Sequence, residues 1–264
     1  MSHSRPSKEI RSKSNAAFKD LKKLAHSSRE RRQRGLVFLE GSRLVETYRR
    51  LCGDPELTVV NASAAPAGSF DSGGRGGVRR VVLSEDLVRQ VTTLSSPPAV
   101  MAVASRPGPR SAAGGDALFL EGIQDPGNVG MVLRSAAGAG VKRVCLSRGC
   151  ADPWSPKCLR SGMGAHFALS IEEESDLPGE AGRFGGAVIA LVPGSRRSLY
   201  QEDLTGEIAF AVGSEGSGLT AALKGSASRA VSIPMPGWEE SLNAAAAATI
   251  CLYEMVRQRT AESR

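Results

Sequence analysis

The chain has 264 residues, of which 41% are hydrophobic and 23% charged, and it carries a net charge of +7. This composition is typical of a soluble globular protein with one large domain or two smaller ones. No apolar run approaches the roughly twenty residues of a membrane-spanning helix, and the basic N-terminus lacks the apolar segment of a secretory signal.

The positive charge is concentrated near the N-terminus. Residues 1–34 contain eleven lysines and arginines against three acidic residues, a net charge of +8, so residues 35–264 sum to −1. Such a local excess indicates a segment that contacts a polyanion, although a solvated helix face with a disordered arm has the same pattern. A transit peptide is a further, minor interpretation of this N-terminus.

The cysteines and histidines do not indicate a metal site. Five cysteines are scattered without a CxxC pair, and the three histidines do not fall at metal-ligand spacing beside them. We therefore expect a protein of the reducing cytoplasm without structural zinc.

A small α/β domain is predicted over residues 14–105, after a disordered basic arm at 1–13. Phe18, Leu21 and Leu24 recur at helical spacing, which predicts a helix from Ser14 with lysines on its other face. The remaining pattern predicts helices at 42–51 and 84–94 and strands at 36–39, 57–61, 78–83 and 99–105, with a loop at 62–77.

Residues 106–115 (RPGPRSAAGG) form the clearest linker, because two prolines and three glycines interrupt both helix and sheet. Strands and helices alternate again over residues 116–264. Strands are predicted at 117–123, 143–147, 187–192, 208–213 and 230–233, and helices at 129–139, 156–163, 218–224 and 241–258. This alternation predicts a mostly parallel sheet with helices on both faces.

Three polar or Gly-rich loops, at 125–128, 213–218 and 234–243, follow predicted strand ends. Ligands of parallel sheets bind outside the carboxyl ends of the strands, so the three loops predict a site. The third loop begins where Pro234 stops a strand and ends at Ser241, an expected N-cap of the final helix. A strand, a turn and a capped helix in this order make a pocket for a small molecule.

The first two loops carry isolated charged residues. Asn128 lies at an apparent N-cap position, and Arg134 follows on an otherwise apolar helix. Arg134 is either half of a buried ion pair, which the helix alone slightly favours, or a phosphate ligand at a site. Glu215 lies in a Gly-rich loop that matches neither phosphate-binding fingerprint, and its charge suits a cationic ligand.

Together, the stretches DPGNVGMVLRSA, FAVGSEGSGL, IPMPGWEESLN and ICLYEMVRQR closely resemble the three motifs of the SpoU/TrmH family of RNA ribose 2′-O-methyltransferases. The resemblance covers residues 117–259, and a looser one relates the N-terminal part to the substrate-binding domain of members acting on ribosomal RNA. It implies a SPOUT-type α/β fold with a C-terminal trefoil knot, preceded by a small L30e-like RNA-binding domain. It also implies S-adenosylmethionine as methyl donor, no metal, and a homodimer in which Arg134 serves the neighbour's cofactor.

By motif position, the resemblance implies a catalytic set of Asn128, Arg134, Glu215, Ser241 and Asn243. It likewise implies a cofactor-binding set of Leu191, Gly213, Ile233, Pro234, Met235 and Leu242. A ribose 2′-hydroxyl must lose its proton as it attacks the methyl group, but an arginine has a pKa above ~12 and is an unusual base. Arg134 either acts as a desolvated base or, as we favour, grips the adjacent phosphate, which takes the proton.

Other functions remain to be weighed against ribosomal RNA methylation. They are methylation of transfer RNA, methylation of a base or a protein, a non-catalytic RNA-binding protein on the same fold, and a nucleotide-dependent enzyme. The presence of Asn128, Arg134 and Asn243 argues against a non-catalytic protein. The absence of both phosphate fingerprints argues against nucleotide dependence. The two-domain layout favours ribosomal over transfer RNA.

Overall fold

The computed structural model describes residues 9–64, 78–109, 114–237 and 241–262. Residues 1–8 of the predicted arm, 65–77 of the predicted loop and 110–113 of the predicted linker lie outside the described residues. The chain divides into two compact units. The first comprises residues up to Pro107 together with Trp154–Phe167, and the second comprises Gly108–Pro153 and Ala168–Arg264.

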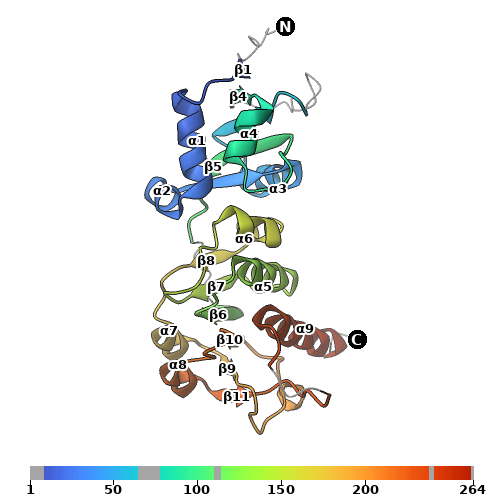
Figure 1. Ribbon diagram of the computed structural model, residues 1–264. Coiled ribbons are helices and arrows are strands. Elements are labelled where there is room, and N and C mark those ends of the chain that lie inside the picture. The colour runs from blue at the N-terminus through green and yellow to red at the C-terminus, as the bar shows by residue number, and fades with distance from the viewer. Residues whose placement is uncertain (1–8, 65–77, 110–113, 238–240, 263–264) are drawn as a thin grey trace. The chain divides into compact units, whose positions relative to one another are not determined.

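The first unit is built on a five-stranded mixed sheet in the order β1-β4-β3-β5-β2 (Figure 1). Its strands are β1 (Glu9–Ile10), β2 (Leu36–Glu40), β3 (Leu57–Asn61), β4 (Arg79–Leu83) and β5 (Val100–Ser105). The prediction of a disordered arm is wrong at its end, because Glu9 and Ile10 pair in parallel with Val82 and Leu83. A backbone hydrogen bond of 3.0 Å from Ser84 N to the Ile10 carbonyl extends this pairing.

The helices of the first unit are α1 (Ala16–His26), α2 (Ser28–Arg34), α3 (Ser42–Cys52), α4 (Glu85–Val91) and α6 (Pro156–Ser161). The Asn15 side chain caps α1, since its Oδ1 accepts a hydrogen bond of 2.9 Å from Ala17 N. The apolar periodicity of α1 is confirmed, because Phe18, Leu21 and Leu24 are buried in the core of this unit. The separate helix α2 was not predicted; its C-cap is Gly35 in the left-handed conformation, φ 61°.

A segment from the C-terminal half of the sequence completes the first unit. Trp154–Phe167 lies between two strands of the second unit in the sequence, but its contacts place it with the first. Its Arg160 donates hydrogen bonds to the carboxylate of Glu40, a side chain with no exposed surface, and to Thr93 Oγ1 at 2.6 Å. Glu40 also accepts hydrogen bonds from Thr92 Oγ1 at 2.6 Å and from Thr93 N at 2.7 Å.

The same segment is packed tightly at its end. The Phe167 ring meets the ring of Tyr48 edge to face, with centroids 5.1 Å apart. Gly164 has a φ of 79°, and a Cβ there would lie 2.9 Å from Thr47 Cγ2. The prediction assigned all of residues 116–264 to one domain. The contacts instead place the fourteen residues Trp154–Phe167 with the first unit.

The second unit is built on six strands in the order β11-β9-β10-β6-β7-β8, all paired in parallel. They are β6 (Ala117–Glu121), β7 (Arg143–Leu146), β8 (Ser170–Glu172), β9 (Ala187–Leu191), β10 (Ile208–Gly213) and β11 (Arg229–Val231). The predicted α/β fold with a mostly parallel sheet is thus confirmed. The short strand β8 was not predicted.

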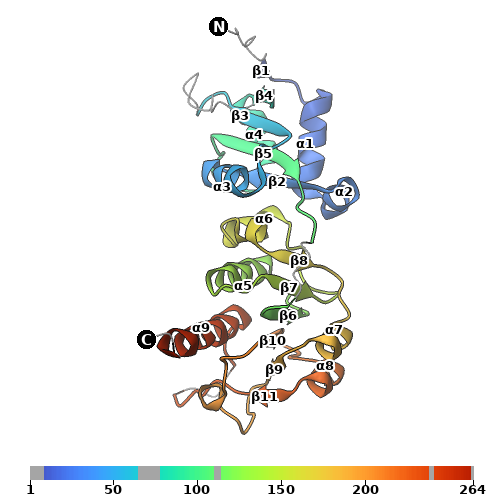
Figure 2. The same cartoon turned by 180° about the vertical axis from the view of Figure 1, so that it is seen from behind.

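Helices cover both faces of this sheet. They are α5 (Pro126–Gly138), α7 (Leu177–Arg183), α8 (Ala221–Ser226) and α9 (Ala244–Glu262). Figures 1 and 2 show α5 beside α9 on one face, and α7 beside α8 on the other. Among the described residues, no helix combines the length and the apolar character needed to cross a membrane.

Candidate functional site

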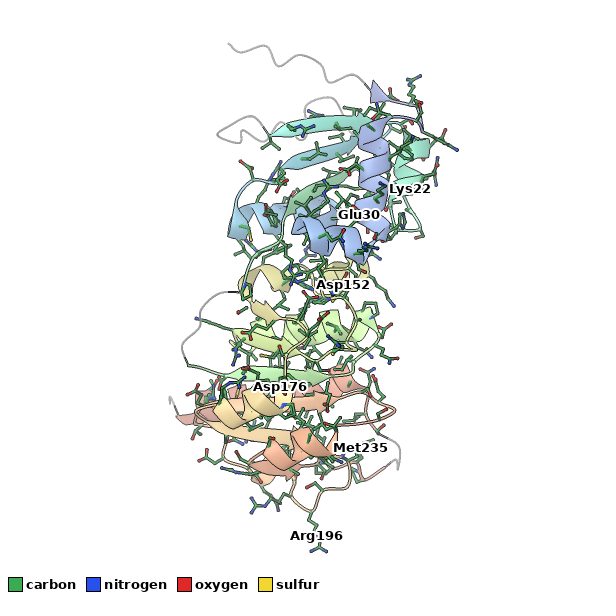
Figure 3. All side chains as sticks on the ribbon, turned by 90° about the vertical axis from the view of Figure 1, so that its left-hand side faces the viewer. Lys22, Glu30, Asp152, Asp176, Arg196 and Met235 are labelled. Carbon is green, nitrogen blue, oxygen red and sulfur yellow. The ribbon has the colours of Figure 1, made fainter. Side chains whose placement is uncertain are left out.

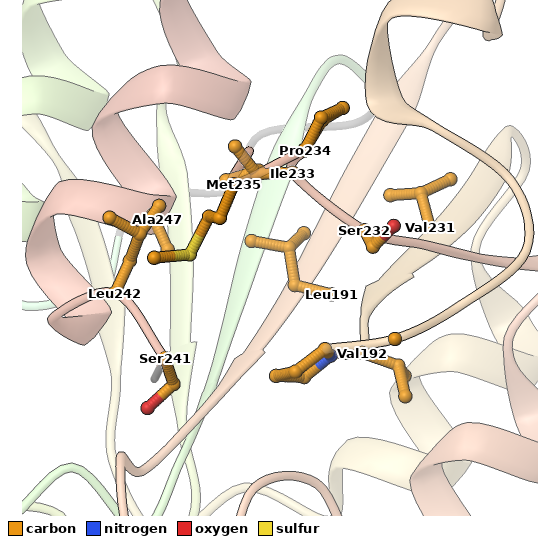
Figure 4. A pocket seen from close by; sticks show the side chains of 12 residues that line it. Leu191, Val192, Val231, Ser232, Ile233, Pro234, Met235, Ser241, Leu242 and Ala247 are labelled. Carbon is orange, nitrogen blue, oxygen red and sulfur yellow. The ribbon is translucent and has the colours of Figure 1, made fainter. Parts of the chain in front are cut away.

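The site lies at the edge of the second unit's sheet where the parallel strands end. A cavity of about 410 Å³ opens there between the loop after β9 and the turn between β11 and α9 (Figure 4). Five of the six residues predicted to bind a cofactor line it, together with one from the predicted catalytic set: Leu191, Ile233, Pro234, Met235, Leu242 and Ser241. The volume falls in the range of small-molecule sites.

Gly213, the sixth predicted cofactor residue, is not among the described lining of this cavity. The loop that follows β10 folds back on it, with a hydrogen bond of 2.9 Å from Gly218 N to the Ser214 carbonyl. A Cβ at position 213 would lie 2.3 Å from the backbone carbon of Gly218. The glycine is therefore required by the closeness of two backbone segments.

Three predicted polar residues form one hydrogen-bonded group, which we call the amide–carboxylate cluster: Asn128, Glu215 and Asn243. Glu215 Oε1 accepts hydrogen bonds from Asn128 Nδ2 at 2.8 Å and from Asn243 Nδ2 at 3.0 Å. It also accepts one from Ala244 N at 3.2 Å, at the start of α9, where a helix favours negative charge. Asn243 Nδ2 lies 3.2 Å from Asn128 Oδ1. The cluster joins the three predicted loops, with Glu215 and Asn243 exposed to solvent and Asn128 half-buried.

Both predicted N-caps at this edge are wrong. Helix α5 begins at Pro126 and is capped by Asp125, whose carboxylate accepts a hydrogen bond of 3.0 Å from Asn128 N. Proline is well suited to the first helical position. The helix therefore starts at Pro126, three residues before the predicted start at Val129. Helix α9 is capped by Asn243 and not by Ser241, since Asn243 Oδ1 accepts a hydrogen bond of 3.0 Å from Ala245 N. Ser241 is thereby left to line the cavity.

Arg134 is exposed on α5. Within the described chain it forms no ion pair or hydrogen bond, so the buried ion pair that the helix sequence favoured is wrong. Its neighbour Ser135 faces α9 instead, with its hydroxyl 2.7 Å from that of Thr249. The guanidinium of Arg134 is therefore available to a ligand from outside this chain.

The only potential metal-ligand group found among the described residues is Cys145, Glu172 and Glu180. Arg143 occupies it by donating hydrogen bonds of 2.9 and 3.0 Å to the two oxygens of Glu172, and a third to Glu180. Burial raises the pKa of the Cys145 thiol to about 12, so the sulfur stays protonated at neutral pH. We interpret this group as an ion-pair network.

The loop after β9 is a wall of the cavity that sequence reasoning did not assign. Val192, Pro193 and Gly194 line the cavity from this loop, and Ser232 lines it from the segment after β11. A Pro-Gly pair just past a strand end is the same kind of signal that identified the other three loops. It could have been found by applying that rule to every strand.

The role of Asn243 can be tested with two substitutions. Asn243→Ala removes both the cap of α9 and a donor to Glu215. The free energy of unfolding should therefore fall by about 1 kcal/mol, and the methyl transfer expected from the family resemblance should fall with it. Asn243→Asp keeps a capping carboxylate but sets a second negative charge beside Glu215. Denaturant unfolding of Asn243→Asp should stay near the parent value while transfer activity drops. Full activity in Asn243→Asp would contradict a functional role for the cluster.

Comparison with known proteins identifies the family of the chain. The model of the SpoU rRNA Methylase family matches residues 117–253. The chain is 34% identical to the 23S rRNA (guanosine(2553)-2′-O)-methyltransferase RlmP of Bacillus subtilis over 255 residues, which cover 94% of this chain and 99% of that protein. The structure also resembles a crystal structure of an RNA 2′-O ribose methyltransferase, with a TM-score of 0.81 and 27% sequence identity. The match covers 96% of this chain and 100% of that one.

A second solved structure was determined with its cofactor. It is the SpoU methyltransferase AviRb from Streptomyces viridochromogenes in complex with AdoMet, 25% identical with a TM-score of 0.83, covering 93% of this chain and 98% of that one. The family model matches just over half of the chain, and the RlmP relative aligns over nearly its whole length. The chain therefore belongs to the SpoU rRNA methylase family.

Proposed function

We propose that this protein transfers a methyl group from S-adenosylmethionine to a ribose 2′-hydroxyl of ribosomal RNA. The observation that carries the proposal is the convergence, at one sheet edge, of an apolar cavity with the amide–carboxylate cluster. These features come from the motifs by which the chain belongs to its family. The relative RlmP, named as a 23S rRNA 2′-O-methyltransferase, aligns over both units of this chain.

The cavity residues fit S-adenosylmethionine. Leu191, Ile233 and Leu242 offer apolar side chains that suit the faces of an adenosine. Among the described lining residues none is charged, so the polar groups of the ligand would be held by main-chain groups and by the hydroxyls of Ser232 and Ser241. When bound, the cofactor supplies an electrophilic methyl group.

Arg134 is proposed to bind the phosphate next to the target ribose. A guanidinium binds phosphate oxygens in a bidentate manner and holds its own proton firmly, so the phosphate is the better acceptor for the proton of the 2′-hydroxyl. Arg134 is exposed and has no partner among the residues that the structure describes, which supports a ligand that arrives with the RNA. Ser241 and Asn243 are proposed to position the ribose. Most of the rate acceleration then comes from bringing the nucleophile into line with the methyl group.

The second unit is further proposed to end in a trefoil knot. The segment after β11 is hydrogen-bonded to the loop after β9, from Ser232 N to the Arg197 carbonyl at 2.8 Å and from Leu199 N to the Ser232 carbonyl at 2.9 Å. The two segments therefore lie side by side, and this closeness supports a knot in this part of the chain.

A homodimer is proposed to form through α5 and α9. Met131 and Tyr253 are half-exposed on these adjacent helices, at 50% each. Arg134 lies one turn after Met131 on the same face of α5, so a partner that covers Met131 also meets Arg134. This arrangement supports a site in which Arg134 serves the partner's cavity.

Light scattering should therefore give a mass of about twice 27.7 kDa. Met131→Glu places a charge in the proposed interface and should yield a monomer without methyl transfer activity. Leu51→Glu is the matched control, because Leu51 is a similarly exposed apolar residue, at 41%, on α3 of the first unit. A monomeric parent protein that still methylates RNA would contradict the shared site.

The first unit is proposed to be the L30e-like domain that binds the RNA substrate. Helix α1 carries what we call the lysine face: Lys19, Lys22 and Lys23, all exposed and without an ion pair in the described chain. Lys22 is labelled in Figure 3. Like charges three and four residues apart disfavour a helix by about 0.2–0.5 kcal/mol per pair, and the buried face of α1 offsets this cost. A phosphate backbone would supply the missing negative charge.

The direct test is incubation of the full-length protein with labelled S-adenosylmethionine and total RNA. We expect label in ribosomal RNA, at a linkage that resists alkali because its 2′-hydroxyl is methylated. Label confined to transfer RNA would change the proposed substrate. Label on a base or on protein would overturn the proposed reaction.

A further inference from the structure

An exposed arginine and an exposed tyrosine lie on the segment that follows β9. Arg196 is solvent-exposed and projects from the second unit (Figure 3), without an ion pair or hydrogen bond in the described chain. The side chain of Tyr200 lies in the short helical turn η2 (Leu199–Gln201) and is 54% exposed. Neither residue belongs to the amide–carboxylate cluster or to the cavity lining.

The backbone that carries these two side chains is fixed at several points. Ser195 Oγ donates a hydrogen bond of 2.8 Å to the Ala230 carbonyl, and Ser232 Oγ donates one of 2.9 Å to the Ser195 carbonyl. A capping box between Ser198 and Gln201 closes the turn that contains Tyr200. A group held in this way binds a ligand at a smaller cost in conformational entropy.

The segment also runs along the cavity. Gly194 lines the cavity, and two residues of chain reach at most about 7 Å, so the Cα of Arg196 lies within that distance of Gly194. On the other side of the segment, Leu199 N donates a hydrogen bond to the carbonyl of Ser232, which also lines the cavity. Tyr200 is the next residue in the chain. The backbone at both positions therefore lies close to the residues that line the cavity.

The neighbouring charges leave Arg196 uncompensated. Glu202 is the nearest acidic residue along the segment, and its buried carboxylate already pairs with Arg197 at 3.4 Å and with Arg229 at 2.8 Å. Arg196 thus presents a positive charge without a partner in the described chain, four residues before the exposed ring of Tyr200. An arginine with an adjacent aromatic ring is a combination typical of surfaces that bind unpaired RNA.

We propose that Arg196 and Tyr200 bind the RNA strand that carries the target nucleotide. The guanidinium contacts a backbone phosphate, and the tyrosine ring stacks on an unpaired base beside the methylated ribose. This inference rests on the proposed function and adds a second RNA contact, separate in sequence from the lysine face. It implies that the target nucleotide is presented in a loop or bulge rather than in a continuous duplex.

The test uses four full-length variants: Arg196→Ala, Tyr200→Ala, Arg197→Ala and Tyr200→Phe. Arg196→Ala and Tyr200→Ala should each weaken binding of ribosomal RNA and raise its KM roughly ten-fold, with kcat and S-adenosylmethionine affinity unchanged. Tyr200→Phe keeps the stacking face and should bind like the parent. Arg197→Ala removes an arginine that is already paired with Glu202, so its effect should be at most about two-fold.

The outcomes separate this inference from the proposed function. A parent protein that methylates no RNA overturns the proposed function, whatever the variants do. A parent that methylates ribosomal RNA, with unchanged RNA affinity and KM in Arg196→Ala and Tyr200→Ala, overturns only the inference. Light scattering provides the last comparison. A monomer in Tyr200→Ala would show that Tyr200 contacts a second copy of the chain, and this would also overturn the inference.

Discussion

Arg134→Ala should lower the rate of methyl transfer at least about a hundred-fold, while the affinity for S-adenosylmethionine stays within two-fold of the parent. Arg134 does not line the cavity, and among the described residues it has no hydrogen-bond or ion-pair partner that its loss would disturb. The rate of methyl transfer should fall because the proposed anchor for the phosphate next to the target ribose is removed, and losses of roughly 10²–10³-fold are typical when a charge-stabilising group is removed from an active site. Calorimetry with the cofactor and a methyl-transfer assay measure the two quantities.

The control for this variant is Arg148→Ala, which removes an exposed arginine from the loop after β7 and should leave the rate unchanged. Mixed dimers test whether Arg134 acts across the interface. Arg134→Ala and Leu242→Arg should each be inactive alone, because the second substitution fills the cavity. In a mixed dimer, one site receives an intact arginine and an intact cavity, so activity should return. Transfer within a few-fold of the parent in Arg134→Ala alone would contradict the proposed role.

Replacing the lysine face by alanine should lower the salt dependence of RNA binding. Each lost phosphate contact lowers the log–log slope by roughly 0.7–0.9, so loss of Lys19, Lys22 and Lys23 should lower it by about 2. At 0.1 M salt the same change corresponds to about a hundred-fold weaker binding. The unfolding temperature should not fall, because the substitutions remove repulsion within α1 and leave its buried face intact. Affinity measured over a salt series provides the slope.

A second triple variant controls for total charge. Arg183→Ala, Lys224→Ala and Arg257→Ala together remove the same number of positive charges from the second unit. If binding depends on the lysine face, this variant should keep nearly the parental slope. Equal slopes in the two triple variants would show that net charge alone attracts the RNA.

Periodicity was sufficient to predict most of the strands and the edge at which the site lies. The strands β6, β9 and β10 are buried and short, and a parallel sheet brings their carboxyl ends to one edge. The positions around Ile233 and Leu242 were assigned by resemblance to a family motif, and the structure places both beside the cavity. These features depend on local patterns that a single sequence contains.

The caps and the cluster depend on information that is not local. Asp125 and Asn128 are both good capping residues three positions apart, and only the folded helix shows which of them is used. Glu215 meets Asn128 across 87 residues of sequence, and Asn243 meets Asn128 across 115. No spacing rule reaches so far. Strand β8 has only three residues and is followed by an acidic stretch, so its hydrophobic signal is too short to recognise.

The position of Trp154–Phe167 affects the order in which the protein can fold during synthesis. The first unit lacks its last segment until the 60 residues from Gly108 to Phe167 have left the ribosome. Until then Glu40 is without Arg160, and a buried carboxylate without its cation is strongly destabilising. In a growing chain the N-terminal domain usually folds first. Here the first unit cannot be completed until residues 154–167 have been synthesised. A chimera that exchanges this domain between relatives must exchange residues 154–167 with it, because Glu40 and Arg160 have to come from the same parent.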